Sequence, residues 1–334
     1  MGPDKQQFNS KIEKNQDFWN NITIMKDCKN LTILAIETSC DDTCAAVLRI
    51  KNKKIKVLSN IISSQTKLHA EYGGVYPFLA KREHQKNLPV VVKKALTPNS
   101  KIDLIAVTAG PGLEPCLWTG VNFAKELAKK INAAIMPVSH IEAHILVNFI
   151  GKNMGDVKSF LPAVCLVVSG GHTQIILMRN LNDYKIIGET RDDAAGECFD
   201  KTARILGLGY PGGPLIAAEA EKAKTSELGI TLPRPMIYQK NYDFSFSGLK
   251  TAVLYDFKKR PAKTRKSKQY VREMANEIQQ AIIDVLTYKT LKAAKSFRIK
   301  SIILSGGVAA NKSLRNQLKK RIKKETTCLL ISKC

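Results

Sequence analysis

Acidic residues are scarce in this 334-residue sequence, which has 29 aspartates and glutamates against 53 lysines and arginines. The resulting formal charge of +24 argues against a basic partner and favours a polyanionic one, nucleic acid before a membrane surface. The alternative is an AT-rich coding bias toward lysine. Composition alone does not separate that bias from a binding function.

Long apolar runs are missing as well. No stretch approaches the roughly 18 apolar residues of a membrane span. Residues 1–30 lack both the apolar core of a signal peptide and the arginine-rich composition of a transit peptide. We therefore expect a cytoplasmic protein without membrane contact, with residues 1–30 as a polar extension and Met25 as an alternative start. The eight cysteines include no CxxC pair, so we expect reduced thiols.

Neither a P-loop nor a Rossmann glycine motif is present, but glycine-rich turns follow several apolar runs. The run 163–168 leads through Ser169-Gly170-Gly171-His172 into a second apolar run, which predicts a buried hairpin. Two glycines would let the N–H groups of this turn converge on an anion, although an ordinary hairpin is the alternative. The segment 305–307 follows another apolar run in the same way and would offer a further backbone cradle.

The organisation of the chain indicates a duplication. A second strand-turn-strand unit starts at Ile33 and is similar to the one that starts at Ala163. Two such hairpins, each heading a half of similar size, predict a duplicated α/β fold with a cleft between an N-terminal lobe, 31–150, and a C-terminal lobe, 151–334. The turn 109–113 follows a predicted strand, at the carboxyl end where open α/β sheets place their ligands.

Histidine is rare, with five residues, yet His140 and His144 are separated by one helical turn. Two imidazoles on one face of a helix can share zinc or iron, and a solvent-exposed pair is the alternative. Ser139 and Glu142 have the spacing of a capping box, so we expect Glu142 to serve the helix start. Zincins place the glutamate directly after the first histidine or directly before the second, so this spacing argues against a metalloprotease.

Three further features have a structural and a functional interpretation. Asp200 lies four residues before Arg204, so an ion pair competes with ligand contact. Asn311 precedes a predicted helix and could cap it or contact a ribose or base. Residues 258–272 hold eight basic residues and no acid, which is typical of a solvated loop or of a surface that follows phosphates.

Together these motifs resemble the TsaD family, the tRNA adenosine threonylcarbamoyltransferases. The resemblance runs in order from about Leu31 to the last residue. It is carried by Ile-Glu-Thr-Ser-Cys-Asp-Asp-Thr (36–43), Ala-Gly-Pro-Gly-Leu (109–113), His140 and His144, Val-Ser-Gly-Gly-His-Thr (168–173), Asp200, Tyr-Pro-Gly-Gly (210–213), Phe-Ser-Phe-Ser-Gly-Leu-Lys (244–250) and Ser-Gly-Gly-Val-Ala-Ala-Asn (305–311).

The resemblance implies a duplicated actin-like or Hsp70-like (ASKHA) nucleotide-binding fold with two lobes and a central cleft. It implies transfer of a threonylcarbamoyl group from threonylcarbamoyl-AMP to N6 of adenosine 37 in tRNAs that read codons starting with A. The partners implied are tRNA, the adenine nucleotide, and TsaB-like and TsaE-like proteins.

The resemblance also assigns roles by position. His140 and His144 match ligands of one divalent metal ion per subunit, iron(II) or zinc. The positions that match adenylate-binding residues are Val167, Val168, Ser169, Gly170, Gly171, Asp200, Gly213 and Asn311. Asp41 or Asp42 could assist removal of the N6 proton, with capping of a turn as the alternative.

Two positions depart from the family pattern. Ala217 stands where the family often has an acid, and Glu219 is the nearest substitute. The family's third metal ligand is an aspartate in a Thr-Asp-Asn segment that follows a cysteine, and the sequence stops at Cys334, where that segment would begin. We therefore expect weak metal binding and poor transfer by these 334 residues. The other functions considered are a nucleotide-binding scaffold of a tRNA-modification complex and an actin-like ATPase or kinase.

Overall fold

The computed structural model describes residues 30–52, 54–96, 101–152, 154–181, 183–224, 227–299, 301–323 and 328–331. The predicted extension, apart from its last residue, lies outside the described residues. Contacts divide the chain into two compact units. Over their described residues, unit 1 comprises Met1–Gln65, Pro77–His140 and Gly151–Asn153, and unit 2 comprises Thr66–Tyr76, Ile141–Ile150 and Met154–Cys334.

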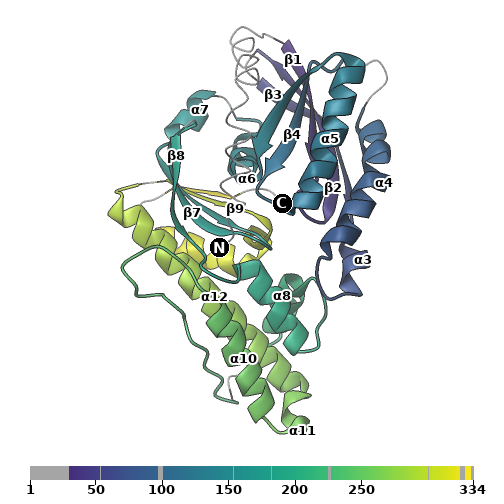
Figure 1. Ribbon diagram of the computed structural model, residues 1–334. Helices are drawn as coiled ribbons and strands as arrows, with labels where there is room; N and C mark the ends of the chain where they lie inside the picture. The colour runs from purple at the N-terminus through teal and green to yellow at the C-terminus, as the bar shows by residue number, and fades with distance from the viewer. Residues whose placement is uncertain are drawn as a thin grey trace. The chain divides into compact units, whose positions relative to one another are not determined.

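Unit 1 is built on a five-stranded sheet in the order β3-β2-β1-β4-β5 (Figure 1). Its strands are β1 (Asn30–Glu37), β2 (Asp42–Lys51), β3 (Lys54–Ser64), β4 (Leu104–Gly110) and β5 (Ala134–Ser139). The first three strands form an antiparallel meander, whereas β4 pairs in parallel with β1, and β5 in parallel with β4. The carboxyl ends of β1, β4 and β5 therefore meet at one edge, where such sheets bind ligands.

Two helices, α4 (Pro77–Ala95) and α5 (Glu114–Ile131), pack on this sheet. Leu88 of α4 and Ala124 of α5 join Leu34 and Val47 in one buried apolar cluster. Pro115 lies in the first turn of α5, as its missing N–H and fixed φ favour. The predicted turn 109–113 thus joins the end of β4 to α5.

Unit 2 repeats the topology of unit 1. Its sheet has the order β10-β9-β6-β7-β8, with strands β6 (Ala163–Val168), β7 (Thr173–Asn180), β8 (Asp183–Glu189), β9 (Ser301–Ser305) and β10 (Cys328–Ile331). Again a meander comes first and two parallel strands extend it on the other side. Numbered within each unit, both sheets read 3-2-1-4-5, which confirms the predicted duplication.

Both faces of β6 are covered, which explains why the run 163–168 is apolar without alternation. Val164 and Leu166 belong to the large core of unit 2, whereas Cys165 and Val167 pack on the opposite face with Ile145. The opposite face packs against residues of α6 (His140–Leu146), η2 (Val147–Phe149) and α7 (Met154–Ser159).

The large core of unit 2 is closed mainly by helices. The remaining helical elements of this unit are α3 (Thr66–Ala70), α8 (Ala195–Ile205), α9 (Gly212–Ala220), α10 (Ser247–Lys259), α11 (Ala262–Arg265), α12 (Lys268–Ser296), η3 (Gly307–Ala310) and α13 (Lys312–Lys323). Among the described residues, no helix combines the length and the apolar character needed to cross a membrane.

The basic segment 258–272 is not a solvated loop, so that interpretation is wrong. It contains the end of α10, all of α11 and the start of α12. Lysine and arginine favour helices, and the Ser267 hydroxyl caps α12 by accepting the N–H of Tyr270 at 3.2 Å. Helix propensity and this cap outweigh the like charges along the segment.

Candidate active site

The turn between β6 and β7 is closed by its own hydrogen bonds. The N–H of Ser169 donates to the His172 carbonyl at 2.8 Å, and the N–H of His172 donates to the Ser169 hydroxyl at 3.1 Å. Cβ atoms added to Gly170 and Gly171 would meet no atom within 4 Å. Packing within the described residues therefore does not require glycine at these positions, and a ligand has room to approach the backbone.

The second glycine turn and a helix start lie against the first turn. A Cβ on Gly306 would lie 2.3 Å from the Val168 carbonyl oxygen, so the turn after β9 is packed on the end of β6. A Cβ on Gly196 would lie 2.5 Å from the Ser169 carbonyl oxygen, which places the start of α8 on the same turn. The next glycine, Gly307, again faces open space. Val167 and Val168 are fully buried, so they position this region without offering side chains to it.

Asp200 connects α8 to the following glycine pair. Its Oδ1 atom accepts the N–H of Gly212 at 2.7 Å and so caps the start of α9. A Cβ on Gly212 would lie 2.6 Å from the Phe199 carbonyl oxygen, whereas a Cβ on Gly213 would meet nothing closer than 4.0 Å. Gly212 is therefore required for packing, and Gly213 leaves space beside the capped helix start.

Asn311 caps a helix, as one of its two interpretations predicted. Its Oδ1 atom accepts the N–H of Leu314 at 2.9 Å at the start of α13, and its Nδ2 donates to Gln279 Oε1 at 2.8 Å. Contact with a ribose or base stays a prediction for this side chain.

In unit 1, a polar cluster gathers where three parallel strands end. His140 Nδ1 lies 3.0 Å from Glu37 Oε2, and the Thr108 hydroxyl donates to the same oxygen at 2.7 Å. The Ser39 hydroxyl lies 3.3 Å from His140 Nδ1. Burial tends to raise the pKa of Glu37, but the hydrogen bond and charge of His140, with hydrogen bonds from Ser39 and Thr108, bring this pKa to about 2. Glu37 is thus an ionised acceptor.

Glu37 has no role among the sequence predictions. Its sequence signals are its position at the end of an apolar run, directly before the predicted turn, and its place in the segment 36–43 that carries the family resemblance. Its contact with His140 joins residues 103 positions apart, which no local pattern reveals.

Asp41 lies in the turn between β1 and β2, and Asp42 is the first residue of β2. His84 of α4 holds this turn, because its Nε2 lies 3.0 Å from the Cys40 carbonyl oxygen and its Nδ1 lies 2.8 Å from the Thr43 hydroxyl. Burial raises the pKa of Asp42, a hydrogen bond from Ser64 opposes this rise, and the adjacent charge of Asp41 adds to it. A carboxylate with a raised pKa is a stronger base.

The two histidines singled out in the sequence both belong to α6, His140 at its first position. The Ser305 hydroxyl donates to the carbonyl of His144, which ties this helix to the end of β9. Within the described ranges, no group of three or more His, Cys, Asp or Glu side chains is placed to hold a metal ion. Two imidazoles are nevertheless donors that zinc and iron accept. Glu142 accepts the Tyr184 hydroxyl at 3.2 Å, a contact the capping-box interpretation did not foresee.

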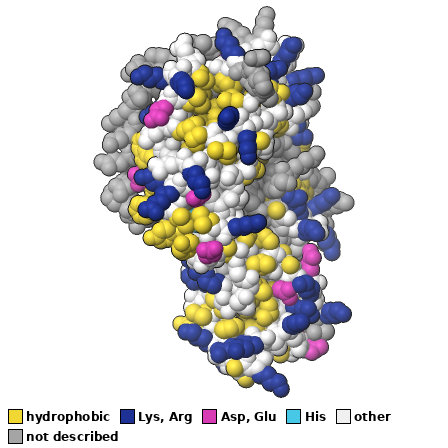
Figure 2. Space-filling model, turned by 90° about the vertical axis from the view of Figure 1, so that its right-hand side faces the viewer, with side chains coloured by type: hydrophobic (Ala, Val, Ile, Leu, Met, Phe, Trp, Pro, Cys, Tyr) yellow, Lys and Arg dark blue, Asp and Glu magenta, His cyan; other side chains and the backbone are white. Residues whose placement is uncertain are grey.

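The basic segment presents five exposed lysines, while its arginines have partners. Arg260 pairs with Asp256 at 3.1 Å, Arg272 lies 3.5 Å from Glu219, and the Arg265 guanidinium lies 5.3 Å from the ring centre of Phe257. The exposed lysines are Lys258, Lys259, Lys263, Lys266 and Lys268. Figure 2 shows lysine and arginine side chains at the lower end of the molecule, where Figure 1 has α11.

The two sheets have the same strand order, and glycine turns follow the strands of unit 2. These features define a protein of the duplicated actin-like class of α/β folds. The solved structure of HypF from T. kodakarensis shares this fold, with a TM-score of 0.57 and 14% identity over 92% of this chain and 45% of that one. HypF in its phosphate- and nucleotide-bound form matches with a TM-score of 0.54 and 12% identity over 90% of this chain and 52% of that one.

The chain belongs to the TsaD family, tRNA N6-adenosine threonylcarbamoyltransferase, whose family model matches residues 56–333. A relative of that name from Syntrophomonas wolfei is 47% identical over 295 residues, 87% of this chain and 84% of the relative. Another from Thermosipho melanesiensis is 46% identical over 305 residues, 90% of this chain and 89% of the relative.

Proposed function

We propose that this chain transfers the threonylcarbamoyl group of threonylcarbamoyl-AMP to N6 of adenosine 37 in tRNAs that read codons starting with A. One observation within unit 2 carries the proposal. The Ser305 hydroxyl donates a hydrogen bond to the His144 carbonyl, and Ser305 is also the first residue of the glycine turn 305–307. A candidate metal ligand and a candidate phosphate cradle therefore share one anchor.

Adenylate would lie over the glycine positions that leave open space, Gly170, Gly171, Gly213 and Gly307. The starts of α8 and α9 border these positions, and the N–H groups and dipole of a helix start favour an anion. The Asp200 carboxylate accepts the N–H of Gly212 and, as a group of two acceptor oxygens, would also accept a hydrogen bond from a ribose hydroxyl. This set would bind the AMP part of the donor.

His140 and His144 would hold one divalent ion, iron(II) or zinc. The donor set fits such an ion, since both imidazoles lie on α6 and that of His140 contacts the Glu37 carboxylate, as histidine ligands do in many metal sites. When bound, the ion would supply Lewis-acid polarisation of the threonylcarbamoyl carbonyl.

The reaction requires a proton acceptor. N6 of adenosine forms a bond to the carbamoyl carbon, the bond from that carbon to the phosphate oxygen breaks, and AMP leaves with the electron pair. N6 loses one proton in the exchange, and Asp41 or Asp42 would accept it. The raised pKa of Asp42 supports a role as base for this residue. Glycine-turn N–H groups would stabilise the charge on the departing AMP.

The tRNA would bind to the exposed lysines of the segment 258–272. Their charges would neutralise phosphates, as expected for a chain with a formal charge of +24. TsaB-like and TsaE-like proteins are the proposed partners, and we propose that the protein acts in the cytoplasm.

The test is reconstitution with the full chain, threonylcarbamoyl-AMP, a tRNA that reads codons starting with A, and the two partner proteins. Mass spectrometry of the digested tRNA should show threonylcarbamoyladenosine above the level found without this protein, even if transfer is as poor as the sequence analysis expects, and the variants His144→Ala and Asp42→Asn should lose most of it. A Glu126→Gln variant, altered on an outer helix of unit 1, should keep full activity. AMP binding without any modified nucleoside would identify a scaffold instead of a transferase.

A further inference from the structure

We propose that Tyr72 and Tyr76 form a stacking platform for an unpaired base of the RNA loop that carries the substrate adenosine. The proposal rests on the proposed tRNA-modifying function and adds to it a surface that recognises the single-stranded part of the substrate. Both tyrosines lie in the segment between α3 and α4, and this segment up to Tyr76 belongs to unit 2.

The two rings are exposed and lie against each other. Tyr72 is 60% exposed and Tyr76 is 54% exposed. Their ring centres are 6.0 Å apart, and the ring planes differ by 24°. Neither ring belongs to the buried apolar clusters that the described residues of unit 2 form. Two nearly parallel and accessible aromatic rings offer the kind of surface on which a nucleobase stacks.

The loop that carries the rings is held by its backbone and by His69. The N–H groups of Tyr72 and Gly74 donate to the His69 carbonyl at 3.1 and 3.2 Å. The His69 side chain is buried, and its Nδ1 atom accepts the N–H of Tyr76 at 3.3 Å. Gly73 has a φ of +67°, which glycine adopts without strain. The tyrosine rings are therefore not needed to shape the loop, and the loop presents them in a fixed place.

Arg204 connects this loop to the proposed adenylate site. It lies on α8, one helical turn after Asp200. A Cβ added to Gly73 would lie 3.0 Å from Arg204 Nε, and one added to Gly74 would lie 3.4 Å from Nη2. The guanidinium is therefore packed on the loop backbone. A base on the tyrosines would lie near the donor nucleotide, as group transfer between the two requires.

The charge beside the rings favours RNA. Lys67 and Glu71 are both exposed and cancel in formal charge, so the exposed Arg204 leaves a positive charge next to the loop. Unpaired RNA bases are recognised by stacking on aromatic rings and guanidinium planes, and basic side chains contact the phosphates. The competing explanation is a protein partner, because tyrosine and arginine are also enriched at protein interfaces. Two measurements on the full chain separate these explanations.

The first measurement is fluorescence anisotropy with a labelled RNA hairpin that has the anticodon stem and loop of the substrate tRNA, without donor or metal. Tyr72→Ala and Tyr76→Ala should each weaken binding about 5–100-fold, through loss of base stacking. Tyr72→Phe keeps the ring and should bind like the wild type, whereas Tyr72→Leu is apolar without a ring and should not. A blunt RNA duplex of the same length has no unpaired base, so all these proteins should bind it equally.

The matched control is Tyr238→Ala. Tyr238 is 81% exposed in the same unit and lies edge-on to Tyr288, with ring centres 5.6 Å apart. Its loss should leave the affinity for the hairpin at the wild-type value. Wild-type affinity for the hairpin in folded Tyr72→Ala and Tyr76→Ala variants would refute the platform. Equal losses for hairpin and duplex, or a wild-type chain that does not prefer the hairpin to the duplex, would refute it as well.

The second measurement is association with the TsaB-like and TsaE-like proteins, by analytical ultracentrifugation. Both alanine variants should associate as the wild type does. Loss of this association with wild-type affinity for the hairpin would assign the tyrosines to a protein interface and overturn the proposal. Tyrosine-dependent hairpin binding by a chain that forms no threonylcarbamoyladenosine would instead refute the proposed transfer and leave the platform in place.

Discussion

Asp200 accepts the backbone N–H of Gly212 at 2.7 Å and thereby caps the helix that carries the glycine pair 212–213. The Asp200 carboxylate therefore has a structural role, capping the helix, in addition to the ligand contact proposed for it. The Asp200→Asn variant can separate these two roles, because asparagine keeps the acceptor oxygen and loses the charge.

We predict that Asp200→Ala loses both functions and that Asp200→Asn loses mainly one. The alanine variant should be less stable by about 0.5–2 kcal/mol through loss of the cap. Its AMP affinity should also fall, by the roughly 1.5–3 kcal/mol of a charged hydrogen bond. Asp200→Asn should keep most of the stability and bind AMP weakly. Urea unfolding and titration calorimetry check the two parts, and wild-type AMP affinity in both variants would leave only the capping role.

The glycines of unit 2 allow a second test of the proposed AMP site, because an added Cβ atom would meet open space at some of them and backbone atoms at others. Gly171→Ala should leave stability within about 0.5 kcal/mol of wild type, because its Cβ would meet no atom within 4 Å. The same change should reduce AMP affinity about tenfold, because the methyl group would occupy the proposed phosphate position.

Gly196→Ala is the matched comparison. Its Cβ would lie 2.5 Å from a backbone oxygen, so the folded state should lose about 1–3 kcal/mol. Thermal unfolding and calorimetry on both variants decide the matter. If Gly171→Ala destabilises the protein as much as Gly196→Ala does, the space over the turn is not open, and wild-type AMP affinity in a folded Gly171→Ala variant would show that it is not the phosphate site.

Some features of the fold and the candidate site could be predicted from the sequence, and others could not. Pairs of apolar runs separated by short polar turns, with glycines in the turn of unit 2, predicted the hairpins of both units and the duplication, because period and turn chemistry are local properties. Glu37 escaped detection, because its partner His140 is brought to it only by parallel pairing of β1, β4 and β5.

The proposed tRNA surface leads to a prediction about salt. Replacing the five exposed lysines of the segment 258–272 by glutamine should weaken tRNA binding. Each lost phosphate contact should also flatten the slope of log affinity against log salt by roughly 0.7–0.9. Fluorescence anisotropy with labelled tRNA between low and moderate salt measures both effects.

The control replaces five exposed lysines of unit 1, Lys51, Lys54, Lys56, Lys93 and Lys94. It removes the same total charge from other elements. If both sets of variants change the slope equally, binding depends on net charge and not on the segment 258–272.

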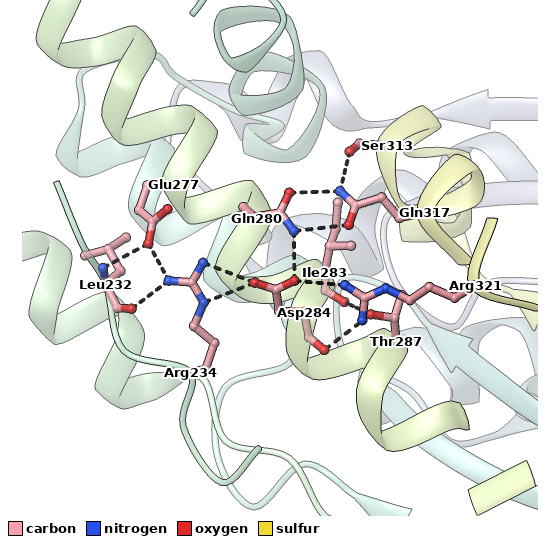
Figure 3. Close-up of polar contacts among 10 residues, drawn as sticks. All are labelled: Leu232, Arg234, Glu277, Gln280, Ile283, Asp284, Thr287, Ser313, Gln317 and Arg321. Carbon is pink, nitrogen blue, oxygen red and sulfur yellow. Dashed lines mark hydrogen bonds and ion pairs between the residues drawn. The ribbon is translucent and has the colours of Figure 1, made fainter. Parts of the chain in front are cut away.

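Asp284 of α12 joins two arginines, as Figure 3 shows. Arg234 Nη2 lies 3.1 Å from Asp284 Oδ2, and Arg321 Nη2 of α13 lies 3.3 Å from Oδ1. Asp284→Ala should cost about 1.5–3 kcal/mol, because two guanidinium groups lose a charged acceptor. Arg321→Gln should cost less than about 1 kcal/mol, since its side chain is 41% exposed. Urea unfolding measures both, and equal costs would contradict the bridging role.

Lys289 of α12 gives a prediction about pH. Its side chain is fully buried and donates to the Asn241 carbonyl at 3.0 Å, without an ion pair among the described residues. Burial, with the charges of Lys292 and Arg191 and against that of Asp243, lowers the pKa of Lys289 from 10.5 to about 8. Between these two values the unfolded chain binds more protons than the folded one. Unfolding free energy should therefore rise as pH increases from 8 to 10.5.

The size of this rise is at most about 3–4 kcal/mol for a shift of this magnitude. Other lysines and tyrosines titrate in the same range, so the informative quantity is the difference between variants. Lys289→Met should lack the rise, because methionine fills the buried site without a charge at any pH. Lys295→Met, altered at an exposed position of the same helix, should keep it. Urea unfolding of the three proteins at several values between pH 7 and pH 10 measures the effect. Parallel curves for wild type and Lys289→Met would show that the buried ammonium is no less stable in the folded protein than in water.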